Sequence, residues 1–139
     1  MATVRGGAFA IAAMASLAAQ PARATATLTC DIEDPVVTFH VMATVGHEAT
    51  SVSGTRGELR LRRAGRTIVL EADHLVATWI EGDELRLRFH VFAEGDGYDT
   101  DLVIVTRRRT ETDYAGRYRL RTGEKRDHAR RGKVACALG

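Results

Sequence analysis

Residues 84–94, with the sequence ELRLRFHVFAE, decide the fold class of this chain. Apolar side chains occupy every second position from Leu85 to Ala93, and the positions between them are mostly charged. Only Phe92 interrupts the polar series. Because successive side chains of a β-strand point to opposite faces, this alternation predicts a strand with one buried and one solvent-exposed face.

The same alternation appears at residues 58–63 and 113–121. Residues 75–80 and several similar segments are instead apolar on both sides, so we expect them to be the more buried strands. Trp79, the only tryptophan, is therefore expected in the core. The candidate strands are residues 26–32, 36–45, 58–63, 67–70, 75–80, 84–94, 102–105, 113–121 and 133–137.

Glycine-containing turns at residues 64–65, 81–83 and 95–97 separate these strands and predict antiparallel hairpins. Residues 46–57 and 122–132 are expected to be longer polar connections. The pattern predicts an all-β domain, a small antiparallel β-barrel of about eight strands, because closure removes exposed strand edges. A two-sheet sandwich is the alternative. An outer-membrane barrel fits less well, because the strands are short and aromatic residues are few.

Residues 1–24 have the features of a secretory signal peptide. Arg5 supplies a positive charge, residues 8–19 form an uncharged run, and residues 22–24 (ARA) are a cleavage site of small residues. The run is shorter than the roughly 20 residues of a membrane-spanning helix. We expect cleavage after Ala24, which leaves a single soluble domain, residues 25–139, in the periplasm or secreted.

Cys30 and Cys136 are the only cysteines and lie near the two ends of the predicted domain. In an oxidising compartment they predict one disulfide between the first and last strands. Closing a loop of about 100 residues restricts the unfolded chain by up to roughly 4 to 5 kcal/mol in the chain-entropy model. A redox-active or metal-binding pair is disfavoured, because the two cysteines do not have C-x-x-C spacing.

Charge is distributed unevenly along the chain. Residues 25–105 carry a net charge of −7 and residues 106–139 a net charge of +7, so the predicted mature chain is formally neutral. The neutral total argues against nucleic acid as a partner. Acidic and basic strands could neutralise one another within one sheet, or the basic part could bind lipopolysaccharide phosphate or an acidic protein surface. The expected residues of such a face are Arg107, Arg108, Arg109, Arg117, Arg119 and Arg121.

Two histidines and two tyrosines are candidate ligand contacts. His40 and His90 lie on the more polar side of their strands and would meet in a polar barrel lumen, with Tyr114 and Tyr118 stacking on a ligand at its mouth. The structural alternative is that the histidines are solvent-exposed and that the tyrosines pack toward the intervening Gly116.

An acidic loop is the candidate cation site. Asp96, Asp99 and Asp101 offer oxygen ligands, although their spacing differs from that of an EF-hand. An ordinary hairpin turn is the structural alternative, and a carboxylate pair for hydrolysis is a further hypothesis.

Motifs for nucleophilic catalysis and for nucleotide binding are missing from the sequence. Ser51 and Ser53 lie outside any G-x-S-x-G pattern, and phosphate-binding glycine motifs do not occur. We therefore predict a binding or inhibitor-like module without catalytic activity or cofactor, which recognises a protein or envelope component. A carrier of a small ligand or metal ion and a structural envelope protein are the alternatives.

In general plan the chain is similar to small periplasmic β-barrel proteins with one disulfide, among them the bacterial inhibitors of c-type lysozyme. That family binds the enzyme cleft through a loop that contains Ser-Gly-x-x-Tyr. Residues 53–56 (SGTR) fit the first positions, whereas Gly57 stands at the tyrosine position and Trp79 lies further along the chain than in that family. The resemblance implies a barrel scaffold that recognises a protein through a loop.

Overall fold

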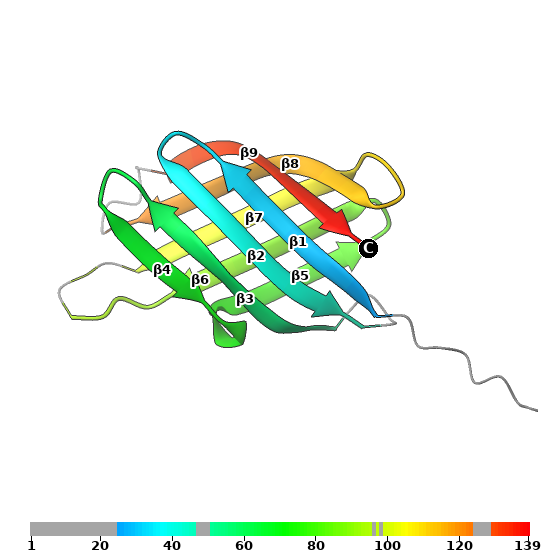
Figure 1. Ribbon diagram of the computed structural model, residues 1–139, viewed down its shortest axis with the longest axis horizontal. Coiled ribbons are helices and arrows are strands. Elements are labelled where there is room, and N and C mark those ends of the chain that lie inside the picture. Colours follow the sequence, from blue (N-terminus) through cyan, green and yellow to red (C-terminus); the bar gives the residue numbers. More distant parts are fainter. Residues whose placement is uncertain (1–24, 47–50, 96, 98, 124–128) are drawn as a thin grey trace, which may run out of the picture.

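The computed structural model describes residues 25–46, 51–95, 97, 99–123 and 129–139, so the predicted signal peptide lies outside the described residues. Nine antiparallel strands form one curled sheet (Figure 1). The strands are β1 (Ala26–Glu33), β2 (Val37–Val45), β3 (Val52–Leu61), β4 (Arg66–Leu70), β5 (Leu75–Glu81), β6 (Glu84–Val91), β7 (Thr100–Arg108), β8 (Asp113–Thr122) and β9 (Ala129–Leu138).

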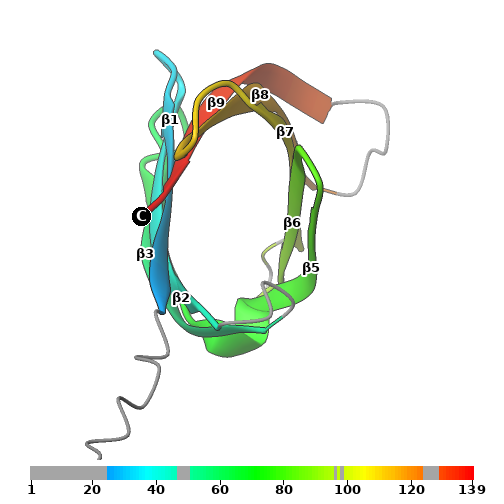
Figure 2. The same ribbon diagram turned by 90° about the vertical axis from the view of Figure 1, so that its right-hand side faces the viewer.

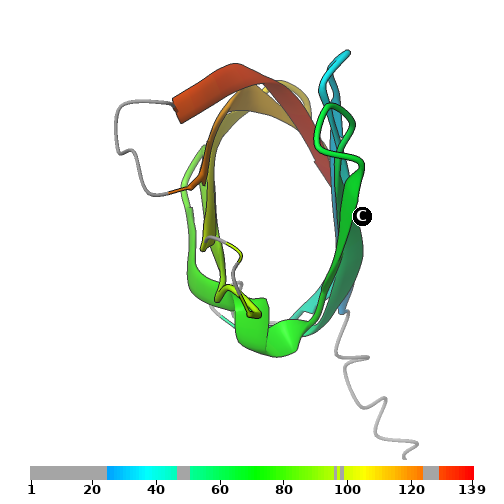
Figure 3. The ribbon, with the colours of Figure 1, turned by 90° about the vertical axis from the view of Figure 1, so that its left-hand side faces the viewer.

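The strand order is β4-β3-β2-β1-β9-β8-β7-β6-β5, so consecutive strands pair with each other except β4 with β5, and β1 also pairs with β9. The two edge strands, β4 and β5, are consecutive, and the short 3-10 turn η1 (Ala72–His74) between them contacts both β3 and β6. Figures 2 and 3 show the resulting sheet curling round its core. A continuous stretch of chain therefore connects the two edges, in place of the ladder that would close a regular barrel.

The all-β prediction is confirmed, and the sheet is barrel-like. Side chains alternate between the inside of the curl and solvent, most regularly along β2, where five buried positions are separated by half-buried or exposed ones. Phe39 and Phe89 meet edge to face at the centre, with ring centroids 5.6 Å apart. A single layer of sheet therefore forms one hydrophobic core on its inner face.

The expectation that strands apolar on both sides are the more buried ones fails for β5, which has no buried residue. Trp79 on β5 is 54% exposed, and Val69 on β4 and Val105 on β7 are also exposed. The physical reason is that the described residues place no second layer over the outer face of this sheet. Where a strand of this sheet is apolar on both sides, the apolar side chains on its outer side are exposed. Trp79 is one of them, so the prediction that it lies in the core is wrong.

The strands extend into both segments that were expected to be polar connections. β3 begins at Val52, and the register between β2 and β3 shifts where Met42 pairs with Arg56 and Thr44 with Ser53. Gly54 adopts a positive φ of 61° in this bulge, a conformation that glycine adopts without strain. β9 begins at Ala129, while residues 47–50 and 124–128 lie outside the described residues. The Ser-Gly segment therefore belongs to a strand.

The predicted disulfide is confirmed. Cys30 and Cys136 are bonded, pair directly across β1 and β9, and lie buried in the core with their Cα atoms 4.1 Å apart. The bond thus joins the first and last strands at the place where they are neighbours in the sheet. The described residues contain no helix that is long and apolar enough to cross a membrane.

Candidate functional site

Tyr114 and Tyr118 lie inside the curled sheet, where they are 2% and 1% exposed. Their alternation on β8 directs both rings inward, and with Phe39 and Phe89 they are the largest fully buried side chains. They therefore fill the interior where a ligand lumen was hypothesised. Gly116, between them, lies so close to β7 that a Cβ atom would overlap the carbonyl oxygen of Val105.

A polar network covers the Tyr118 hydroxyl at the β1–β2 turn. This hydroxyl donates to Asp34 Oδ2 at 2.8 Å, and Arg130 Nη2 donates to Asp34 Oδ1 at 2.6 Å. The backbone N–H of Val36, followed by Arg130 and Tyr118, stabilises the ionised carboxylate and lowers the pKa of Asp34 to about 2. Burial and the neighbouring Asp34 raise the pKa of Tyr118. The network thus connects the β1–β2 turn with β8 and β9, which are far apart from it in sequence.

Tyr114 has a charged neighbour as well. Arg108 Nη2 donates to the Tyr114 hydroxyl at 2.9 Å, and the guanidinium carbon lies 5.4 Å from the centre of the Tyr114 ring. Arg108 pairs with Tyr114 in the ladder between β7 and β8 and therefore points the same way. Its side chain covers the core next to Asp83, whose Oδ1 lies 3.9 Å from Arg108 Nε.

The two candidate histidines lie on different strands and each contacts an acid. His40 on β2 is on the outer face, where its Nδ1 lies 2.5 Å from Asp31 Oδ1. His90 on β6 has ring nitrogens 3.5 Å from Asp99 Oδ2 and 3.5 Å from Asp101 Oδ1. The structure therefore does not bring the histidines together with the inward-facing tyrosines.

The acidic loop uses its carboxylates for local contacts. Asp99 Oδ1 accepts a hydrogen bond from the backbone N–H of Ala93 at 2.8 Å, and Asp101 Oδ1 accepts one from Arg88 Nε at 2.9 Å. Asp96, the third residue of the predicted cation site, lies outside the described residues. In the described part of the chain, no three His, Cys, Asp or Glu side chains are grouped in a way that could hold a metal ion.

Basic side chains gather on the outer face of β7, β8 and β9. β7 and β8 pair as an antiparallel hairpin, and the alternation of β8 points its arginines outward. Arg108 has the opposite orientation to its two neighbours, because adjacent residues of a strand face opposite sides. β9 adds two cations that the sequence analysis missed. We call this set the basic face, and its residues are Arg107, Arg109, Arg117, Arg119, Arg121, Arg131 and Lys133.

Like charges stand directly opposite each other in the middle of the basic face. The ladder between β8 and β9 pairs Arg117 with Lys133 and Arg119 with Arg131. Like charges that stand directly opposite each other on neighbouring strands destabilise a sheet. In the described part of the chain, arginine ion pairs are formed by Arg60, Arg86, Arg88, Arg108 and Arg130, and by none of the basic-face residues.

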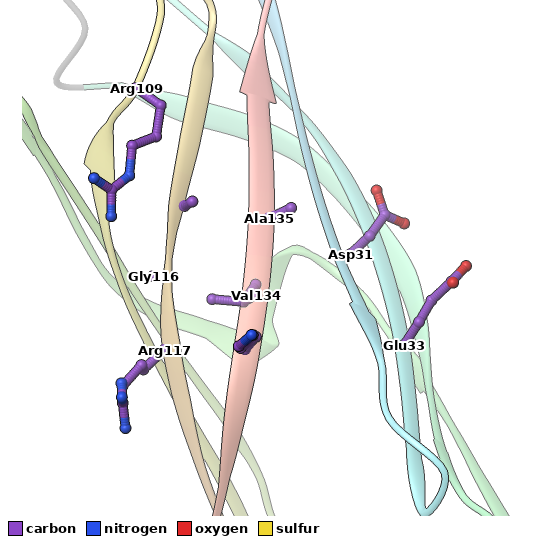
Figure 4. Close-up of a pocket in the computed structure, with 9 residues that line it drawn as sticks. Asp31, Glu33, Arg109, Gly116, Arg117, Val134 and Ala135 are labelled. Carbon is purple, nitrogen blue, oxygen red and sulfur yellow. The ribbon is translucent and has the colours of Figure 1, made fainter.

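A groove of about 590 Å³ runs along one side of the basic face. Figure 4 shows Arg109 and Arg117 on one side of the groove, Asp31 and Glu33 on the other, and Gly116, Val134 and Ala135 between them. Because the residues of β8 and β9 are small here, this part of the outer face is recessed. Arg117 on β8 and Arg109 in the turn before it form the positive side of the groove. Asp31 and Glu33 form its acidic side, where the basic face ends.

Exposed apolar side chains lie beside the basic face. Trp79 on β5, together with Val103 and Val105 on β7, points outward, and we call these three residues the apolar strip. A second groove of about 250 Å³ lies between Trp79 and Val103. The outer face of β5–β9 therefore presents both charge and apolar surface.

Comparison of the chain with protein-family models, with curated proteins and with solved structures finds no match.

Proposed function

We propose that this protein is an exported periplasmic binding module without catalytic activity, and that its basic face recognises an anionic protein or envelope component. The observation that carries the proposal is the pair of like-charge contacts, Arg117 with Lys133 and Arg119 with Arg131. An anion placed over these side chains would replace their mutual repulsion with charge-assisted hydrogen bonds. The free protein thus has unfavourable contacts that binding would relieve.

The filled interior supports recognition at the surface over transport of cargo. Small-molecule sites are usually concave and enclose most of the ligand. Here the buried rings of Tyr114, Tyr118, Phe39 and Phe89 occupy the inside of the sheet. The grooves described above are instead on the outer face.

The disulfide supports an oxidising compartment, because such bonds form and persist outside the reducing cytosol. Together with the signal peptide predicted at residues 1–24, it favours the periplasm or secretion.

A pull-down from envelope extract tests the proposal with a pair of matched variants. Arg117→Gln/Arg119→Gln removes two charges from the basic face, and Arg56→Gln/Arg63→Gln removes two from β3 and its following turn. The wild type and the second variant should retain an anionic component at low salt and release it at high salt, because surface ion pairs are screened. Equal retention by the first variant, or no retained component, would contradict the proposal.

A further inference from the structure

The register of the sheet alternates cations and apolar side chains across the outer face of β5–β9. One row runs from Trp79 through Arg86, Val105 and Arg117 to Lys133. The next row places Val103 between Arg88 and Arg119. Charge and apolar surface are therefore interleaved over distances of one strand, about 5 Å.

The cations of this face differ in whether they already have partners. Arg86 forms an ion pair with Glu84, and Arg88 with Asp101. On β8 and β9, Arg130 is paired with Asp34, whereas the outward-facing Arg117, Arg119, Arg121, Arg131 and Lys133 form no ion pair among the described residues. The part of the face open to an outside anion is therefore β8 and β9, and the apolar strip flanks it on the side of β7 and β5.

We propose that the outer face of β5–β9 docks on the surface of an anionic lipid bilayer. Lipid phosphates would lie over Arg117, Arg119, Arg131 and Lys133, and Trp79 would enter the interfacial region, where tryptophan is favoured. An acidic protein surface would satisfy the cations equally well, but charge alone does not account for the neighbouring exposed Trp79 and Val105. This inference rests on the proposed function and names its partner.

Trp79 is the only tryptophan of the chain and serves as an internal probe. The test uses the disulfide-bonded protein purified from periplasm, mixed with vesicles of phosphatidylcholine alone or with added phosphatidylglycerol. We expect cosedimentation and a blue shift of the tryptophan emission with the anionic vesicles only. Each cation near the membrane surface strengthens binding roughly fivefold, so Arg117→Gln/Arg119→Gln should weaken binding by about twenty-fivefold. The control Arg56→Gln/Arg63→Gln should bind like the wild type.

A parallel binding experiment with polyglutamate distinguishes failure of this inference from failure of the proposed function. Binding to polyglutamate but not to anionic vesicles would overturn the lipid inference and leave an acidic protein as partner. Binding to neither ligand, with nothing retained from envelope extract, would overturn both. Sedimentation with vesicles without a shift of the Trp79 emission, or with an unaffected Arg117→Gln/Arg119→Gln variant, would also overturn the lipid inference.

Discussion

At the scale of single residues, Asp34 connects parts of the chain that are far apart in sequence. Its carboxylate receives hydrogen bonds from the backbone of Val36 and from the side chains of Tyr118 and Arg130, 84 and 96 residues away. These donors favour the ionised form. The carboxylate therefore ties the β1–β2 turn to β8 and β9.

This network predicts a specific pH dependence of stability. The pKa of Asp34 falls from 3.8 to about 2 in the folded protein, so the folded state binds a proton less readily than the unfolded state. The contribution of Asp34 ionisation to the free energy of unfolding is therefore complete above about pH 4 and is lost as the pH falls toward 2. Asp34→Asn should remove that part of the pH dependence in urea unfolding measured across this range.

Asp73→Asn is the matched control, because the Asp73 side chain is 80% exposed. It should keep the pH dependence of the wild type. If Asp34→Asn and the wild type lose stability in parallel as the pH falls, the Asp34 network does not stabilise the fold.

Gly116 makes the second prediction at this scale. A Cβ atom there would overlap backbone atoms of Val105 and Thr106 on β7, which cannot move as a flexible side chain does. Gly116→Ala should therefore destabilise the protein by about 1 to 3 kcal/mol, as overpacking does in cores. Ala115→Ser, one residue away in the open groove, should have little effect. Equal free energies of unfolding for both variants would contradict the close approach of β8 and β7.

At the scale of elements, the pairing of β1 with β9 connects the two ends of the described domain. The disulfide between Cys30 and Cys136 spans 106 residues, and closing so long a loop restricts the unfolded chain by up to about 4 to 5 kcal/mol. Reduction should therefore lower the free energy of unfolding of the wild type by up to that amount. Comparing oxidised and reduced wild type keeps both sulfur atoms in the core and so isolates the cross-link. Unchanged stability after complete reduction would show that the bond contributes nothing.

The strands themselves could be predicted because alternation needs only local sequence. Residues 84–94 alternate so strictly that β6 follows from them directly. The start of β3 could not be predicted, because a bulge at Gly54 lets a polar, glycine-containing segment continue the ladder. Nor could Asp34 be paired with Tyr118 and Arg130, since that contact exists only after β1, β8 and β9 are assembled.

At the scale of the whole molecule, the candidate site is a property of the sheet's outer face. The outward arginines of β8 were predictable from alternation, and the same rule would have separated Arg108 from Arg107 and Arg109. Arg131 was missed because residues 122–132 were expected to be a connection, whereas Lys133 was overlooked although it begins the predicted strand 133–137. Trp79 was misplaced because hydrophobicity alone does not reveal that a sheet has a single layer.

Both proposals require that the basic face contacts the anionic partner. Chemical modification of arginine by phenylglyoxal, quantified by peptide mass spectrometry with and without anionic vesicles, tests that claim residue by residue. We expect the vesicles to protect Arg117, Arg119 and Arg131 and to leave Arg56 and Arg63 as reactive as before. Equal protection of both groups, or protection of Arg56 and Arg63 alone, would contradict it.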